Sequence, residues 1–161
     1  PGGRDCRVCI KLRRECQTKE LATIKDERAK NKATGVTTAY IPGDFAKMNK
    51  LNIKTVDGVY DLFGDKSVVL FPTPGHTPGH QSLMVKQSNG TIAILCADAE
   101  YTLENMNDAI PPGLAWDIPQ SSQALNMFKV MQWMSSNVEV VPSHDPKYWS
   151  NKPLAPKLYE L

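Results

Sequence analysis

The sequence predicts an α/β fold in which a mixed β-sheet is flanked by helices. Short apolar runs of strand length recur in the second half of the chain, at about residues 67–71, 82–87, 91–97 and 137–141. A longer segment, residues 119–136, instead repeats its apolar residues at helical spacing. Strands followed by a long connection, a helix and another strand are typical of a layered α/β arrangement.

Composition is compatible with one domain and supports neither a nucleic-acid partner nor a membrane partner. The chain has 161 residues, of which 41% are hydrophobic, and a formal net charge of +2. A charge so close to zero does not favour binding to polyanions or lipid surfaces. No run of about 18 apolar residues is present, so no transmembrane helix is predicted.

The positive charge is concentrated at the start of the chain. Residues 1–32 carry a net +5 and the rest carries −3. Residues of about 10–31 predict a helix with a thin apolar stripe, which Thr34-Gly35 ends. Because charge runs are usually solvated, we interpret residues 1–35 as a basic, helical or loosely ordered leader. The stripe consists of Leu12, Cys16 and Ile24.

The cysteines do not indicate a dedicated metal site. Cys6, Cys9 and Cys16 follow a C-x2-C-x6-C spacing, which lacks the second cysteine pair or the histidine pair of a zinc finger. Cys96 lies within an apolar strand and is interpreted as a small buried hydrophobe. This usage predicts a reduced, cytoplasmic protein.

The core is expected over residues 36–149. Asp57-Gly58 lies between two strand-like segments, which is a hairpin signature. These segments are Ile53–Val56 and Val59–Leu62. Residues 150–161 contain two prolines and are expected to form a surface tail.

Residues 119–136 give the clearest helix signal. Pro119 suits the first turn, and Asn137 suits the end of the helix. The apolar stripe is expected to face the core. Its members are Ala124, Leu125, Phe128, Met131 and Met134.

Residues 102–118 form a long connection with Pro111-Pro112-Gly113 at its centre. Such a connection is often a lid or a wall of a substrate pocket. The alternative is that Leu114 and Trp116 simply pack onto the domain, and the residues alone do not decide between the two.

Three strand ends deliver residues that can bind metals. His80 ends the loop Pro72–His80, whose prolines and glycines exclude a helix. Asp98 and His144 follow the next two apolar strands of the chain. Strand ends at one edge of a sheet can converge in space, and imidazole with carboxylate suits zinc and similar divalent metals. Taken singly, each residue could instead be an ordinary turn or cap residue.

Four stretches give the chain a resemblance to a known family. The chain resembles the second half of a metallo-β-lactamase-fold hydrolase, and within that superfamily an N-acyl-homoserine lactonase. The resemblance covers about Gly43 to Trp149. Its Pro-Gly-His loop is shared across the superfamily, whereas the Asp98-x-x-Tyr101 step and the Ser-His-Asp-Pro sequence are narrower. The stretches are Gly58–Asp65, Thr73–Leu83, Ala97–Met106 and Pro142–Trp149.

The resemblance implies half of an αββα sandwich and a site with two divalent metal ions, expected to be zinc. It assigns His80 to one metal, His144 to the other and Asp98 as the bridge between them. It implies that Tyr101 donates a proton to the oxyanion that develops on a small lactone substrate. His76 is not a ligand in the family pattern and is expected to orient its own loop. Three further carboxylates are expected near the site: Glu100, Glu104 and Asp145.

One departure from the family is large. The family carries an H-x-H-x-D-H motif that supplies most of the metal ligands, and this chain, with three histidines in all, has none. We therefore interpret the chain as a fragment or truncated product that begins near where that motif ends. Whether it is an enzyme by itself is left open. The alternatives are a thioester or organophosphate hydrolase of the same fold, and an inactive or partner-binding fragment. Half a sandwich would also expose one sheet face, through which a dimer could form.

Overall fold

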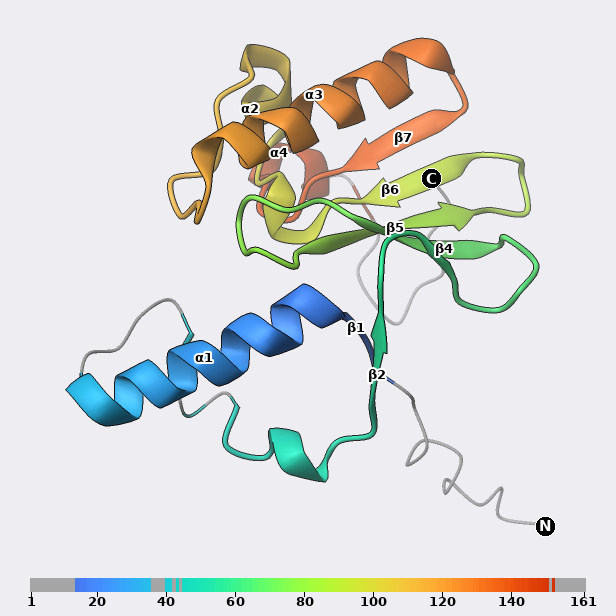
Figure 1. Ribbon diagram of the computed structural model, residues 1–161. Helices are drawn as coiled ribbons and strands as arrows, with labels where there is room; N and C mark the ends of the chain where they lie inside the picture. Colours follow the sequence, from blue (N-terminus) through green and yellow to red (C-terminus); the bar gives the residue numbers. More distant parts are fainter. Residues whose placement is uncertain (1–13, 36–39, 42, 44, 151, 153–161) are drawn as a thin grey trace, which may run out of the picture. The chain divides into compact units, whose positions relative to one another are not determined.

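The computed structural model describes residues 14–35, 40–41, 43, 45–150 and 152 (Figure 1). The chain divides into two compact units, residues 1–56 and 57–161, which are taken in turn. The predicted features at Cys6, Cys9 and Leu12, and the tail from residue 153 onward, lie outside the described residues.

In the first unit, a strand precedes the helix that the sequence predicts. Strand β1 (Arg14–Gln17) pairs in parallel with β2 (Ile53–Val56), and the helix α1 (Thr18–Thr34) follows directly. The expected start near residue 10 and the place of Cys16 on a helical stripe were therefore wrong. Pairing with a distant segment has overridden the local helical pattern, and Thr18 Oγ1 donates to Val56 O at 3.4 Å beside that pairing. The predicted end is confirmed, because Gly35 adopts a left-handed φ of 70°.

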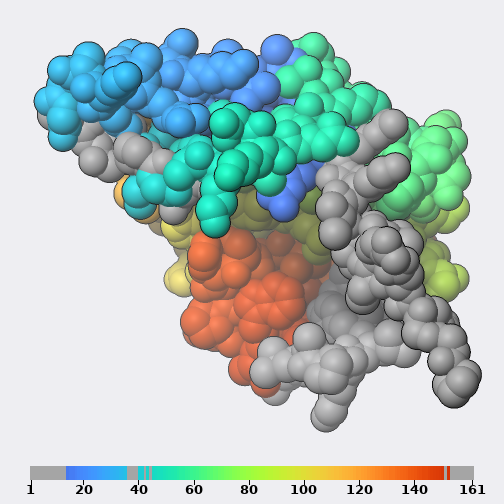
Figure 2. Space-filling view, turned by 90° about the horizontal axis from the view of Figure 1, so that it is seen from below, coloured from blue at the N-terminus to red at the C-terminus, as the bar shows by residue number. Residues whose placement is uncertain are grey.

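Helix α1 buries only a narrow face. Ile24, Glu27 and Asn31 are buried at helical spacing, and most other positions are exposed. Figure 2 shows part of the exposed surface of this helix in blue. The two polar members have partners: the Glu27 carboxylate lies 2.7 Å from Lys30 Nζ, and the Asn31 amide donates to Tyr40 O at 3.2 Å. A short 3-10 helix, η2 (Met48–Lys50), precedes β2.

The second unit contains a five-stranded mixed sheet, as predicted. The strand order is β3-β4-β5-β6-β7, with β6 and β7 parallel and every other pair antiparallel. This sheet and its flanking helices confirm the predicted α/β class. The strands are β3 (Tyr60–Asp61), β4 (Val68–Pro72), β5 (Gln81–Lys86), β6 (Ile92–Leu95) and β7 (Val138–Val141).

The hairpin expected around Asp57-Gly58 is absent from the described residues. Strand β2 pairs with β1, whereas β3 pairs with β4, so the two strands belong to different sheets. Gly58 does make a turn, with a φ of 72°. Asp61 accepts hydrogen bonds from the backbone of Gly64 and Lys66 at 2.9 Å each, which closes the turn between β3 and β4 instead.

Helix α3 (Ile118–Met134) lies along one face of the sheet (Figure 1). Leu125 and Phe128 are completely buried in the core between helix and sheet, so the predicted apolar stripe is confirmed there. Met134 is an exception to the predicted stripe, because it is 74% exposed at the end of the helix. The helix also ends at Ser135 rather than Asn137, since Ser135 is already extended with a φ of −152°.

The long connection contains a helix that the sequence did not reveal. Helix α2 (Leu103–Asp108) begins with a capping box, in which Thr102 and Asn105 bond to each other's backbone N–H groups. Its single buried apolar residue, Met106, joins the core under α3. Beyond it, Leu114 and Trp116 are 73% and 49% exposed, so they do not pack into the core.

The candidate site residues lie at one end of the sheet. β5 runs antiparallel to β6, and β7 runs parallel to β6. The first residue of β5 therefore lies at the same end of the sheet as the last residues of β6 and β7. The short helix α4 (Pro146–Trp149) follows β7 at this end. Separately, none of the helices in the described part of the chain is long and apolar enough to cross a membrane.

Candidate active site

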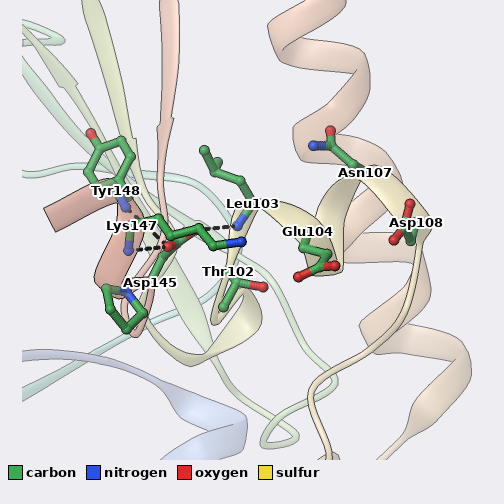
Figure 3. Close-up of a pocket in the computed structure, with 9 residues that line it drawn as sticks. Thr102, Leu103, Glu104, Asn107, Asp108, Asp145, Lys147 and Tyr148 are labelled. Atoms are coloured by element: carbon green, nitrogen blue, oxygen red, sulfur yellow. Dashed lines mark hydrogen bonds between the residues drawn. The ribbon is translucent and has the colours of Figure 1, made fainter. Parts of the chain in front are cut away.

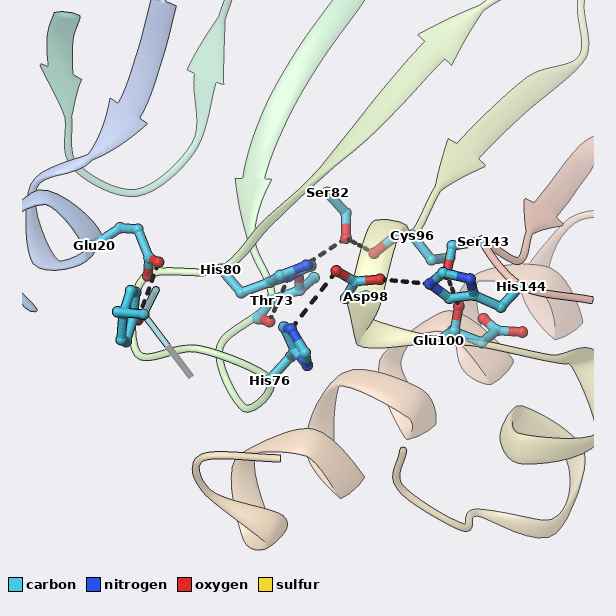
Figure 4. A network of polar contacts seen from close by, with 11 residues as sticks. Glu20, Thr73, His76, His80, Ser82, Cys96, Asp98, Glu100, Ser143 and His144 are labelled. Atoms are coloured by element: carbon cyan, nitrogen blue, oxygen red, sulfur yellow. Dashed lines mark hydrogen bonds and ion pairs between the residues drawn. The ribbon is translucent and has the colours of Figure 1, made fainter. Parts of the chain in front are cut away.

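His80, Asp98 and His144 are delivered to this end of the sheet by three neighbouring strands. His80 directly precedes β5, Asp98 lies in the 3-10 helix η3 (Ala97–Ala99) that follows β6, and His144 follows β7. The loop of His76 lies beside them (Figure 4). Dashed lines in Figure 4 join His76 and His144 to Asp98 in one network, whereas His80 contacts Thr73.

Asp98 is the centre of this network. Its Oδ1 atom lies 3.0 Å from His144 Nε2, which is a hydrogen-bond distance. Its Oδ2 atom lies 3.6 Å from His76 Nε2, which is longer than a hydrogen bond but close enough for electrostatic contact. The Asp98 and His144 side chains are 44% and 60% exposed, so this part of the site is open to solvent.

Backbone hydrogen bonds hold the segment that follows Asp98 against the segment that contains His144. Ser143 donates through both its N–H and its hydroxyl to Glu100 O, each at 3.1 Å, and the His144 N–H donates to Tyr101 O at 2.9 Å. Ala97, immediately before Asp98, has a φ of 48°, a left-handed conformation that is strained for a residue other than glycine. Strain of this kind concentrates at functional sites, where the surrounding structure enforces it.

Tyr101 lies against the histidines. Its ring centroid is 4.7 Å from that of His144 and 6.3 Å from that of His76, both at steep angles. Burial raises the pKa of the Tyr101 phenol, and the charge of Asp98 raises it further. The phenol therefore keeps its proton at neutral pH and can act as a hydrogen-bond donor.

Contacts with Thr73 orient the His80 ring. Its Nδ1 atom lies 2.8 Å from Thr73 Oγ1 and 3.1 Å from Thr73 O. Its ring meets that of His76 edge-on, with 5.9 Å between centroids. The His76 loop is itself tied to the start of α3, because the N–H groups of Trp116 and Asp117 donate to His76 O and Gly75 O.

Glu100 is the functional candidate whose environment the sequence did not foretell. The residue is fully buried, and among the described residues neither of its carboxylate oxygens has a hydrogen-bond partner. Burial, opposed by the nearby Cys96 thiol and supported by the charge of Asp145, raises the pKa of Glu100 to about 7. An acidic residue after an apolar strand gives no signal of burial, so only the fold reveals it.

Asp145 and Glu104, also expected near the site, line a neighbouring pocket of about 720 Å³ (Figure 3). Asp145 accepts hydrogen bonds from the backbone of Leu103, Lys147 and Tyr148, so it joins the starts of α2 and α4. Burial raises the pKa of Asp145, but these N–H groups outweigh it and the net shift is downward. Asp98, His76 and His144 are not among the residues that line this pocket.

The side chains fit a divalent metal in kind but not in number. Imidazole nitrogens and a carboxylate are ligands that zinc prefers, and a closed zinc site takes four of them. Within the part of the chain that the structure describes, no three His, Cys, Asp or Glu side chains are grouped so as to hold a metal ion. These residues therefore fit one side of a metal centre rather than a complete one.

Comparisons of sequence point to lactonases. The chain is 37% identical over 108 residues to the N-acyl homoserine lactonase AttM of Rhizobium radiobacter, covering 65% of this chain and 40% of that protein. It is 43% identical over 61 residues to an N-acyl homoserine lactonase of Bacillus cereus, covering 38% and 24%. The chain thus spans about two fifths or less of the length of these curated relatives. No protein-family model matches it.

Comparisons of structure agree on the fold. An N-acyl homoserine lactone hydrolase, solved with N-hexanoyl-L-homoserine at its catalytic metal center, matches with a TM-score of 0.74 and 23% identity. That match covers 92% of this chain and 53% of the other. The dizinc quorum-quenching lactonase AidC matches with a TM-score of 0.58 and 18% identity, covering 82% and 47%.

These likenesses confirm the expected fold and the expected resemblance. At 23% identity or less, the solved structures show the fold alone. The curated relatives indicate common ancestry over the residues that align. The chain has a partial metallo-β-lactamase fold and, over the 65% of its length that aligns, is similar in sequence to an N-acyl homoserine lactonase.

Proposed function

We propose that this chain provides one side of the active site of a metal-dependent hydrolase that opens the lactone ring of N-acyl homoserine lactones. The observation that carries the proposal is the cluster of Asp98, Tyr101 and His144. Asp98 Oδ1 lies 3.0 Å from His144 Nε2, and the Tyr101 ring packs at 4.7 Å against the His144 ring. The relatives named as lactonases support the choice of substrate.

We expect two divalent metal ions, zinc in the first instance, in the complete site. His80, Asp98 and His144 would be this chain's ligands, with the others supplied by the H-x-H-x-D-H motif that it lacks. The chemistry that such metals supply when bound is the activation of water at neutral pH. The chain's own part is to hold Asp98 and His144 at one end of the sheet. The backbone hydrogen bonds of Ser143 to Glu100 O and of His144 to Tyr101 O join the segments that carry them.

Tyr101 would stabilise the negative charge that develops on the substrate. When hydroxide adds to the lactone carbonyl, negative charge develops on the carbonyl oxygen. A protonated phenol beside the metal ligands can donate a hydrogen bond to that oxygen, and the donation is strongest in the transition state. The place of the ring against His144 and the raised pKa of the phenol both support this role.

The experiment joins this chain to the part of the R. radiobacter lactonase that carries the H-x-H-x-D-H motif. We expect the joined protein to open N-hexanoyl-homoserine lactone in the presence of Zn²⁺, and the chain alone to be inactive. Matched reactions with a thioester and a phosphotriester test the alternative substrates. Faster turnover of either one would move the function to another hydrolase of this fold, and a folded, metal-loaded but inactive protein would contradict the proposal.

A further inference from the structure

A line of short, buried polar contacts runs from His80 into the core. His80 Nδ1 lies 2.8 Å from Thr73 Oγ1, which lies 2.8 Å from Ser82 Oγ, which in turn donates to Cys96 O at 3.2 Å. The residues Thr73, Ser82 and Cys96 are each no more than 1% exposed. Figure 4 shows these side chains at the start of β5, between the ends of β4 and β6.

The direction of every proton in this line follows from its last member. Cys96 O is a carbonyl and can only accept, so the Ser82 hydroxyl proton points to it. Ser82 must then accept from Thr73, and the Thr73 hydroxyl in turn must accept from His80 Nδ1. The proton of a neutral His80 ring is therefore on Nδ1.

A second contact gives the same assignment independently. His80 Nδ1 also lies 3.1 Å from Thr73 O. This oxygen is again a carbonyl, so the ring nitrogen beside it must be the donor. Both contacts to Nδ1 thus require a proton there.

We propose that Thr73 and Ser82 are positioning residues that hold His80 in its Nδ1–H tautomer, with the lone pair on Nε2. The line connects three strands, since Thr73 follows β4, Ser82 lies in β5 and Cys96 follows β6. It therefore fixes both the tautomer and the plane of the ring. The two hydroxyls act through His80 and do not themselves reach the reacting atoms.

The consequence for metal binding rests on the proposed function. A ring nitrogen can bind a metal only through a lone pair, and hydrogen bonding of the other ring nitrogen fixes which nitrogen has it. In water neutral histidine prefers the opposite tautomer, with its proton on Nε2. The buried line would thus prepare His80 for a metal before any metal binds.

The test uses the full chain without metal and needs no enzymatic activity. Long-range ¹⁵N–¹H NMR in the presence of a chelator, at about pH 9 so that imidazoles are neutral, reports the tautomer of each histidine. We expect His80 to be predominantly Nδ1–H. Ser82→Ala removes the acceptor for the Thr73 hydroxyl proton, so one of the two contacts that favour Nδ1–H is lost. Thr73 O still accepts from Nδ1, so the Nε2–H fraction of His80 should rise at least twofold without becoming dominant.

Thr73→Val should shift the tautomer in the same direction, and Thr73→Ser, which keeps the hydroxyl, should restore the wild-type population. His76 and His144 serve as internal controls, because their tautomer populations should be the same in the variants as in wild type. A wild-type His80 with its proton on Nε2 would overturn the proposal. So would an unchanged tautomer in folded Ser82→Ala protein. Either result leaves the lactonase proposal intact, because no metal or substrate is involved.

Discussion

His144 Nε2 lies 3.0 Å from Asp98 Oδ1, although 46 residues separate the two in sequence. The pairing of β6 with β7 brings them together, because both residues follow the carboxyl ends of parallel neighbours. The two side chains are partly exposed, so their contact contributes little to folding. Stability therefore does not account for this contact.

The first prediction separates the stability effects of two proposed metal ligands. His144→Ala should change the free energy of unfolding of the metal-free chain by no more than about 0.5 kcal/mol, because the side chain is 60% exposed. His80→Ala should cost about 1–2 kcal/mol, because it removes the Nδ1 donor and leaves Thr73 polar atoms short of a partner. Chemical denaturation measures both. A His144→Ala protein that no longer melts cooperatively would show that His144 is structural.

The second prediction concerns the loop before His80. Gly75 has a φ of 141°, and a Cβ at this position would meet the backbone and hydroxyl of Ser121. Gly75→Ala should therefore destabilise the chain by about 2–4 kcal/mol. Gly90→Ala is the matched control, because Gly90 also has a positive φ, of 89°, but open space around it. It should cost only about 1 kcal/mol. Equal losses in thermal or chemical denaturation would contradict the packing of this loop against α3.

The third prediction uses the buried carboxyl of Glu100. Its pKa is about 7 in the folded chain against an ordinary 4.5, mainly because of burial. Below pH 4.5 the Glu100 carboxyl is protonated in both the folded and the unfolded states, so its burial costs no deprotonation free energy. Between 4.5 and 7 the unfolded state releases its proton first, so stability should fall as pH rises, by an amount on the order of 2–3 kcal/mol.

Glu100→Gln is the matched variant for this window. Glutamine has a similar shape but no charge, so the variant should be more stable than wild type at about pH 8 and nearly equal to it below pH 4.5. Urea denaturation across this range, in a chelating buffer, gives the difference. Parallel stability curves for the two proteins would show that Glu100 is not the group responsible.

The fourth prediction tests Tyr101 in the joined protein. Tyr101→Phe should retain the metals and lower kcat for lactone opening by up to about 10²-fold, with less effect on KM, because its hydroxyl acts on charge that develops in the transition state. Steady-state kinetics with metal analysis gives both quantities. Unchanged lactone kinetics would remove Tyr101 from the mechanism.

The fold class could be predicted because the second unit obeys local rules. The apolar runs of β4, β5, β6 and β7 have strand length, and Leu125 and Phe128 of α3 recur at helical spacing and are fully buried. The errors fall where non-local pairing decides. Cys16 lies on an apparent helical stripe, but its segment pairs with β2. Met134 continues the periodicity to the last residue of α3, where it is exposed.

The candidate site could be predicted only in part, for a related reason. Residue types at strand ends indicated His80, Asp98 and His144, since strand ends meet at one edge of a sheet. The environment of each depends on neighbours from other strands. The Thr73–Ser82–Cys96 line and the burial of Glu100 arise from strand register, and single residues in a sequence do not reveal register.

The most direct test of the central claim is the rate of lactone opening by the joined protein compared with its Asp98→Asn variant. Asparagine keeps the size and removes the charge of the residue that contacts both His144 and His76. We predict a Zn²⁺-dependent rate for the joined protein and a rate at background for the variant, with the same circular dichroism spectrum and melting behaviour. A folded Asp98→Asn protein that opens the lactone as fast as its parent would contradict the account.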